Sequence, residues 1–148
     1  MKRFRFALES VLTLRKFRKS EKAAELSVAL RRRMTVEERL ERCHEALGEM
    51  ENRLRKTLAG SARVQEILLL QEALKERRGE LATLRQSALE ALEKENRARE
   101  AVKVARQECE ALVRLEETQR ERARKDAEKD DEKAMEEFVM ARRAVMGS

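Results

Sequence analysis

Few side chains in this sequence are of the types that perform chemistry, and two of those are adjacent. His44 is the only histidine among 148 residues, and it directly follows Cys43. A thiol next to an imidazole has the composition of a nucleophilic pair. Successive residues of a helix point about 100° apart, however, and no third group that would orient the imidazole is evident. We therefore expect both residues to be structural and the chain to have no catalytic site.

The acidic side chains are numerous but are not spaced as metal ligands. Carboxylates between residues 124 and 133 are interleaved with lysine and arginine, and no glycine pattern of a calcium loop accompanies them. The chain also lacks a glycine-rich phosphate loop, zinc-ligand spacing and a nucleophile elbow. The sequence predicts no metal and no cofactor, and we interpret this acidic stretch as a solvated face of mixed charge.

Composition argues against a compact enzyme and for long helices. Charged residues make up 43% of the chain, aromatic residues 3%, and proline is absent. These proportions are typical of coiled coils rich in Ala, Glu, Lys, Leu and Arg. Disorder would also explain the charge, but disordered chains lack regularly spaced apolar residues. The elements that position every other feature are therefore expected to be helices.

Apolar residues recur at alternating intervals of three and four, which is the signature of a coiled-coil seam. The first half of the chain carries one such series, and the second half carries another. Their members are Leu8, Leu12, Leu26, Ala29, Val36, Leu40, Cys43, Leu47, Met50 and Leu54, followed by Ile67, Leu70, Leu74, Leu81, Leu84, Ala88, Ala91, Ala98, Val102, Ala105, Cys109 and Leu112. Two long amphipathic helices are predicted.

The two predicted helices are expected to form one antiparallel hairpin. Gly60 is a helix stop, and Ser61 after it is a candidate N-cap. Pairing residues whose numbers add to about 124 aligns both seams, for example Met50 with Leu74. We predict an all-α fold, a long antiparallel two-helix coiled-coil hairpin with a longer second helix. A single domain over 1–148 would hold helices over about 4–58 and 64–144 and a turn at about 59–63.

Charged residues interrupt the first seam, and the second predicted helix is longer than the first. Lys19, Lys22 and Arg33 occupy seam positions, where we expect their aliphatic stems to pack and their charges to reach solvent. Some 25 residues at the C-terminus have no predicted partner in the chain, although an apolar stripe continues through them. A stripe without an internal partner predicts an external one, or fraying.

The N-terminal segment combines positive charge with large apolar side chains. Residues 1–33 carry eleven cations and three anions, a net charge of +8. Basic charge could neutralise nucleic-acid phosphates, but the cations surround the predicted helix and no extended stacking platform accompanies them. We therefore expect no nucleic-acid partner. The segment either closes the seam or docks into a partner protein, because it has more apolar groups than a two-stranded seam can cover.

No stretch approaches the roughly 20 uninterrupted apolar residues that a membrane span needs. The start of the sequence also lacks the apolar core of a secretory signal. From the sequence alone we expect a soluble protein with no direct membrane insertion.

The opening residues resemble those of the flagellar FliJ family. The run Phe4-x-Phe6-x-Leu8-Glu9-x-Val11-Leu12-x-Leu14-Arg15 matches the family's opening pattern, and Glu21, Ala23, Ala24 and Leu26 follow it. Near the other end, Leu112, Leu115, Glu116, Asp131, Glu132 and Phe138 are similar to its C-terminal helix. The resemblance spans nearly the whole chain, and its specific part is the first fifteen residues.

The resemblance implies a non-enzymatic stalk of the bacterial flagellar type III export apparatus. Such proteins place their paired terminal helices in the central pore of the hexameric export ATPase and promote its assembly and activity. They also contact the export-gate membrane protein through the surface nearer the bend, and they bind export chaperones. The implied location is cytoplasmic, at the periphery of the inner-membrane export apparatus.

Carried onto this chain, the family roles give two sets of candidate contact residues. For the ATPase ring they are Phe4, Phe6, Leu8, Val11, Leu12, Leu14, Arg15, Met135 and Phe138. For the export gate they are Arg39, Cys43, His44, Met50, Leu70 and Leu74. The gate set departs from the pattern of some relatives, because this chain has no tyrosine.

Three other functions also fit the sequence. The equivalent stalk of virulence-associated type III secretion has the same design. A homo-oligomeric coiled-coil adaptor would explain the apolar stripe at the C-terminus, and a binder of nucleic acid or of another acidic surface would explain the basic first third.

Overall fold

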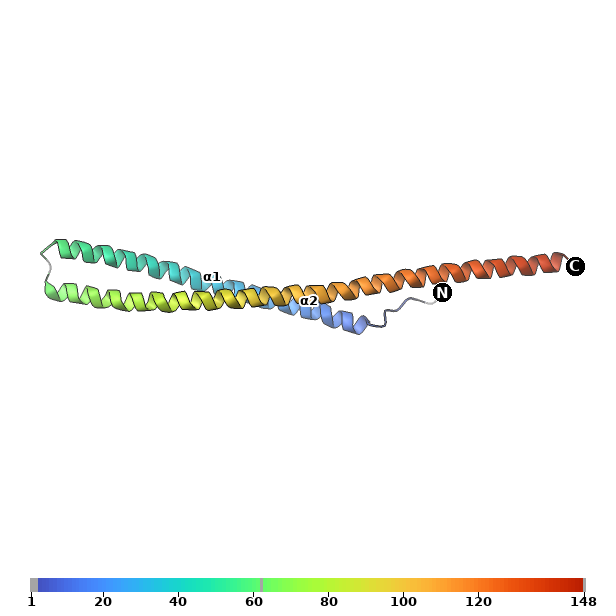
Figure 1. The fold of residues 1–148 in the computed structure, drawn as a ribbon, viewed down its shortest axis with the longest axis horizontal. Coiled ribbons are helices and arrows are strands. Elements are labelled where there is room, and N and C mark those ends of the chain that lie inside the picture. The colour runs from blue at the N-terminus through green and yellow to red at the C-terminus, as the bar shows by residue number, and fades with distance from the viewer. Residues whose placement is uncertain (1–2, 62, 148) are drawn as a thin grey trace. The chain divides into compact units, whose positions relative to one another are not determined.

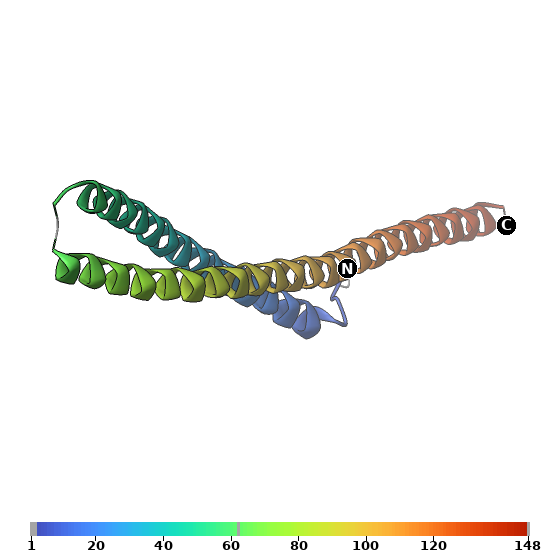
Figure 2. The same cartoon turned by 60° about the vertical axis from the view of Figure 1, so that its left-hand side comes forward.

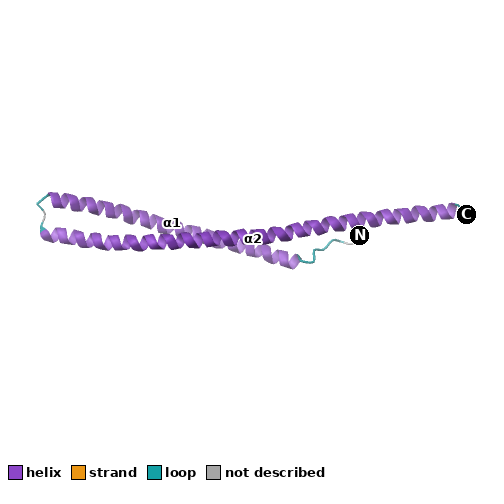
Figure 3. Cartoon of the chain, viewed as in Figure 1, coloured by secondary structure: helices purple, strands orange, loops and turns teal. Residues whose placement is uncertain are grey.

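The computed structural model describes residues 3–61 and 63–147, and all regular structure in them is helical (Figure 3). Helix α1 covers Glu9–Ala59, and helix α2 covers Val64–Met146. The fold is all-α with a longer second helix, as predicted. Within the described ranges no helix has the length and apolar character needed to cross a membrane. Ala62 of the expected turn lies outside the described residues.

Packing divides the chain into two compact units, each built from parts of both helices. The bend unit comprises Glu21–Lys103, and the terminal unit comprises Met1–Ser20 with Val104–Ser148. In the bend unit α1 and α2 run antiparallel from the short connection that joins them (Figures 1 and 2). This arrangement confirms the hairpin. The prediction of a single domain stays a prediction.

The core of the bend unit is a narrow row of apolar side chains between the helices. Cys43, Leu47, Leu74 and Leu81 are buried there, and Leu74 is only 2% exposed. Leu40, Met50, Leu54 and Leu84 pack against them. Both members of the predicted pairs Met50/Leu74, Cys43/Leu81 and Leu40/Leu84 belong to this cluster. The contacts therefore agree with a register in which facing residue numbers add to about 124.

The N-terminus of α2 has a different N-cap residue from the one predicted. The carbonyl of Arg63 accepts hydrogen bonds from the amides of Glu66, at 3.0 Å, and Ile67, at 3.3 Å. Arg63 therefore occupies the N-cap position of α2. The prediction of Ser61 as the cap was wrong because α2 begins at Val64, too far along the chain for the Ser61 side chain to serve its first turn.

A carboxylate is buried in the seam of the bend unit. The Glu95 residue is 3% exposed, and its carboxylate forms ion pairs with the guanidinium groups of Arg33 and Arg99, the latter at 2.7 Å. Arg33 also contacts Glu37 at 2.9 Å. The expectation that the Arg33 charge would simply reach solvent was wrong, because Glu95 on α2 offers it a partner across the seam. Lys22 does reach the surface, where it pairs with Glu25 at 3.2 Å.

This network shifts the titration of its members. The hydrogen bond from Arg99 and the charge of Arg33 lower the pKa of Glu95 below its ordinary value of 4.5, although burial opposes them. The hydrogen bond to Glu37 raises the pKa of Arg33. The charged forms of both groups are therefore favoured in the folded bend unit.

In the terminal unit, α1 starts at Glu9 and not near residue 4 as predicted. Phe6 leaves the helical path and is buried with Leu12 and Cys109, and Phe4 packs against the same cluster. Burying a phenylalanine side chain contributes about 1.5–3 kcal/mol, which exceeds what one more exposed helical turn offers. The tertiary contacts of these two phenylalanines therefore set the start of the helix.

Replacing Leu74 with alanine should destabilise the hairpin. The substitution leaves a cavity in the core row, so we expect the free energy of unfolding to fall by about 2–5 kcal/mol in chemical denaturation. Leu69→Ala in the same helix is the matched control, because Leu69 is 73% exposed and should change stability by less than about 0.5 kcal/mol. Equal losses for the two variants would contradict the register.

Glu95→Gln should lower the melting temperature at neutral pH but not at low pH. Since the folded-state pKa of Glu95 is lowered, its ion pairs stabilise the fold above the ordinary value of 4.5, and this stability is lost as pH falls through the folded-state pKa. Thermal melts of both proteins over acidic pH should therefore converge. Glu93→Gln removes an exposed pair with Arg97 and should have a smaller effect. A pH-independent difference for Glu95→Gln would argue against the ion pairs as its cause.

Candidate partner-binding surfaces

All nine ring candidates lie in the terminal unit, but they do not share one environment. Phe6 and Leu12 are 6% and 2% exposed, so they form the core with Cys109. Phe4 is half-buried, and the guanidinium of Arg120 lies 5.2 Å from its ring centre. This distance suits a cation–π contact between α2 and the opening segment. These three residues hold the segment in place, and Phe6 and Leu12 offer no surface to a partner.

The remaining N-terminal candidates form an exposed apolar face. Leu8, Val11 and Leu14 are 38%, 39% and 55% exposed, and Phe17 beyond them is 67% exposed. Leu8 lies just before α1, and the other three follow at intervals of three residues, so the four side chains wind around the start of α1 by about 60° per step. Arg15 beside them pairs with Glu108 of α2 at 2.5 Å, which fixes this stretch of α1 on α2. We call these four apolar residues the N-terminal apolar face.

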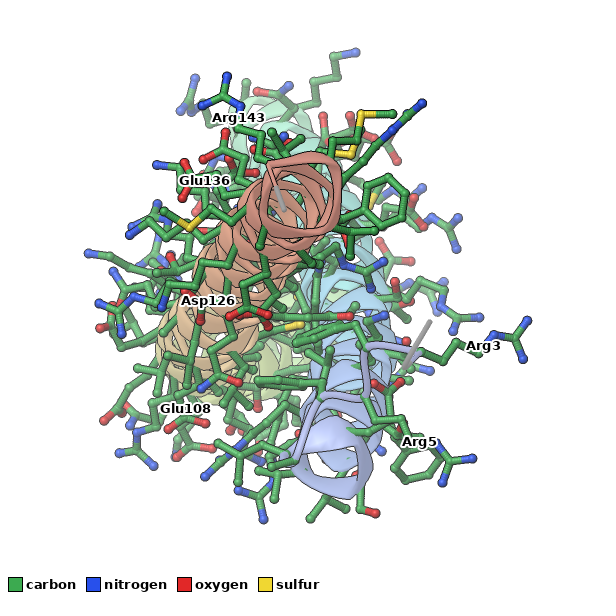
Figure 4. All side chains as sticks on the ribbon, turned by 90° about the vertical axis from the view of Figure 1, so that its right-hand side faces the viewer. Arg3, Arg5, Glu108, Asp126, Glu136 and Arg143 are labelled. Atoms are coloured by element: carbon green, nitrogen blue, oxygen red, sulfur yellow. The ribbon has the colours of Figure 1, made fainter. Side chains whose placement is uncertain are left out.

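Basic side chains surround this face. Arg3, Arg5, Lys16, Arg18 and Lys19 are all exposed. Figure 4 shows Arg3 and Arg5 extending away from the ribbon. The face therefore combines apolar contact area with positive charge, the composition needed to dock on an acidic protein surface with apolar pockets.

The last part of α2, residues 124–146, is helical and exposed along its whole length. We call it the overhang. The candidates Met135 and Phe138 are 67% and 63% exposed, and Val139 and Met140, which sequence analysis did not single out, are 42% and 71% exposed. Their intervals of three and four along a helix were the signal that could have found them. A furrow of about 460 Å³ runs between Met135, Val139 and Met140, flanked by Glu132, Glu136 and Arg143.

The six gate candidates all lie in the bend unit, and the structure separates them by burial. Cys43 and Leu74 are core residues, and Met50 and Leu70 are half-buried. Arg39 and His44 are exposed. His44 lines a furrow of about 300 Å³ next to the core leucine Leu81. Arg39 and His44 are therefore the members of this set that are exposed to a partner.

Sequence analysis missed a larger apolar groove in the bend unit. The groove has a volume of about 1110 Å³, and residues of both helices line it. Val28, Ala29 and Ala91 lie along it, with charged residues at its edges. The signal in the sequence was the run of short side chains that α1 and α2 bring to the same level of the seam.

The thiol of Cys43 is paired with a backbone carbonyl and not with the adjacent imidazole. It lies 3.8 Å from the carbonyl of Arg77 and donates its hydrogen bond there. Cys43 and Cys109 are both free and buried. Across the described residues, no group of three or more His, Cys, Asp or Glu side chains could hold a metal ion. What the surface does offer is apolar area bordered by charge, which suits protein partners.

Comparison with known proteins identifies a family. No curated protein and no solved structure matches the chain. A family model described as flagellar FliJ protein matches residues 4–146. The match includes the opening run from Phe4, the core of the bend unit and the whole overhang. The chain therefore belongs to the flagellar FliJ protein family.

Proposed function

We propose that this chain is a non-enzymatic stalk of the flagellar export apparatus, whose terminal unit binds the central pore of the hexameric export ATPase and promotes its assembly and activity. Family membership supports a general stalk or chaperone role in flagellar export. The observation that carries the finer proposal is the exposed N-terminal apolar face, bordered by basic side chains on a segment that its own core holds in place.

Burying the N-terminal apolar face against a partner would contribute free energy to binding. Fully burying a leucine or valine side chain contributes about 1.5–3 kcal/mol, and Leu14 and Phe17 keep more than half of their surface exposed in the free chain. Association must overcome the loss of rigid-body freedom before any of this appears as affinity. Because Phe6 and Leu12 fix the segment in advance, less is lost to ordering it on binding.

Charge would guide the same contact. The net charge of +8 over residues 1–33 favours a ring pore with an acidic lining, and it would speed the encounter at low ionic strength. Salt screens such attraction over a Debye length of about 8–10 Å. The proposal therefore includes association that slows as salt is raised, while the apolar contact persists.

The double variant Val11→Ser/Leu14→Ser should lose binding to the hexameric export ATPase. Both side chains are exposed, so the fold should survive while the contact area does not. We expect the dissociation constant to rise by roughly tenfold or more and the stimulation of ATP hydrolysis to fall with it. Binding can be followed by calorimetry and hydrolysis by phosphate release.

Leu68→Ser/Leu69→Ser provides a matched control. These leucines are 59% and 73% exposed in the bend unit, so the variant changes similar apolar surface outside the terminal unit. It should bind and stimulate like the unaltered chain. If both double variants bind equally well, the N-terminal apolar face is not the ring contact and the stalk proposal loses its site.

We also propose that the bend unit contacts the export-gate membrane protein and export chaperones. Arg39 and His44 support this role, because they are the exposed members of the candidate set. Arg39→Ala/His44→Ala should weaken binding of the soluble part of the gate protein in a pull-down and leave ATPase binding unchanged. Unchanged gate binding would remove this surface from the proposal.

The flagellar description of the family favours this system over the equivalent virulence stalk. A location at the cytoplasmic periphery of the inner-membrane export apparatus follows from the same proposal. Self-association as an adaptor is favoured by one separate observation, the exposed apolar side chains of the overhang.

A further inference from the structure

The last turns of the overhang carry a row of apolar side chains between two furrows. Val139 lines both furrows, the one of about 460 Å³ that also includes Met135 and a second of about 520 Å³ that includes Met146. These three side chains lie within about 40° of one another around the helix, and all are exposed. We call them, together with the charged residues beside them, the overhang face. Those charged residues are Glu136, Arg142 and Arg143.

The charges of the overhang face change sign along α2. Glu136 comes first, with Glu132 in the same furrow one turn before it, and the two arginines follow. Lys133 lines neither furrow, because it lies about 120° around the helix from Val139. The face therefore begins acidic and ends basic in the direction of the chain.

Neither end of the face is neutralised within the chain. Glu136 and Arg143 are seven residues apart, so they lie on the same side of the helix (Figure 4) and about 10 Å apart along its axis. Neither forms an ion pair within the described part of the chain. Both charges are therefore available to a partner that is basic where the face is acidic and acidic where the face is basic.

The same face on an antiparallel second copy meets this requirement at both ends. Residue numbers that add to about 280 bring Glu136 of one copy to Arg143 of the other, and Met135 to Met146. A two-fold axis repeats each contact, so two ion pairs flank the apolar row. Arg142 lies at the level of Val139, where its aliphatic stem can pack while its charge reaches solvent. A parallel pair would instead set the acidic residues of both copies side by side.

We propose that two copies of this chain pair through the overhang face, antiparallel and over about the last three turns of α2. A copy cannot supply this contact to itself, because the face is one side of one continuous stretch of helix within the terminal unit. Only these last turns overlap, so the two helices extend away from the contact in opposite directions. The proposal gives a site and a geometry to the self-association named above, and it does not depend on binding to the ATPase.

Charge reversal tests the contact directly. So short an interface belongs to the weak class, and we expect the full chain to dimerise in sedimentation equilibrium with a dissociation constant of roughly 0.1–1 mM. Glu136→Arg and Arg143→Glu should each raise this constant roughly tenfold, because each makes both ion pairs repulsive. An equal mixture of the two variants should dimerise again, and so should the double variant Glu136→Arg/Arg143→Glu.

Glu137→Arg is the matched control, because it changes the net charge equally while residue 137 lies about 160° around the helix from Val139. It should dimerise like the unaltered chain. An unaltered chain that stays monomeric throughout this concentration range would overturn the proposal. Dimerisation that ignores both single reversals would place self-association on another surface and would overturn this contact as well.

Cysteines at the two ends of the apolar row test the antiparallel order. Met135→Cys chains mixed with Met146→Cys chains should form a mixed disulfide under mild oxidation, while Cys43 and Cys109 are buried. Met135→Cys alone should form little disulfide, since its two copies would lie about 16 Å apart along the axis. A disulfide between two Met135→Cys chains in preference to the mixed one would indicate a parallel pair and overturn the proposal.

Discussion

A seam between two helices accepts little more than one row of side chains from each, and this limit determines what the remaining surface must do. In the bend unit Cys43 and Leu47 meet Leu74 and Leu81, and the row is full. Further apolar residues, such as Leu69 at 73% exposure, stay outside it. Monomeric soluble proteins rarely expose large contiguous apolar patches. Binding surfaces are thus a direct consequence of so narrow a core, and the apolar residues that it excludes supply the contact area.

The narrow seam also contains a buried charged side chain, the carboxylate of Glu95. A leucine at this position would fill the seam with less desolvation cost, so the ion pairs with Arg33 and Arg99 are weak evidence for stability. What these ion pairs do is fix the register of α1 against α2. A hairpin that slipped along its seam would bury the carboxylate away from Arg33, and an uncompensated buried charge is strongly destabilising. Regular heptads permit such slips, and one polar position can exclude them.

The sequence was sufficient for the seam but not for the ends of its elements. Alternating apolar intervals predicted both helices, because helical periodicity is a local property. The turn at Gly60 then predicted their antiparallel order, and aligning the two seams predicted the level of Leu74. The start of α1 depended instead on where Phe4 and Phe6 find a tertiary partner, and the N-cap at Arg63 depended on the geometry of the connection. The candidate sites divided in the same way. Sequence pattern found Leu8, Val11 and Leu14, but only packing separated them from Phe6 and Leu12, and the apolar groove required both helices.

The overhang is helical although it does not pack in the seam between α1 and α2. An isolated helix must first form a costly nucleus, because its first turn fixes several residues for one hydrogen bond. Here the helix continues from the packed part of α2, so nucleation has already occurred, and the ion pairs of Arg124 with Glu121 and Glu128, each at 2.6 Å, favour its propagation. Met135, Phe138 and Met140 are consequently presented in fixed positions before any partner arrives. A partner that takes the overhang loses less free energy to ordering it, so modest apolar contacts suffice for a specific complex.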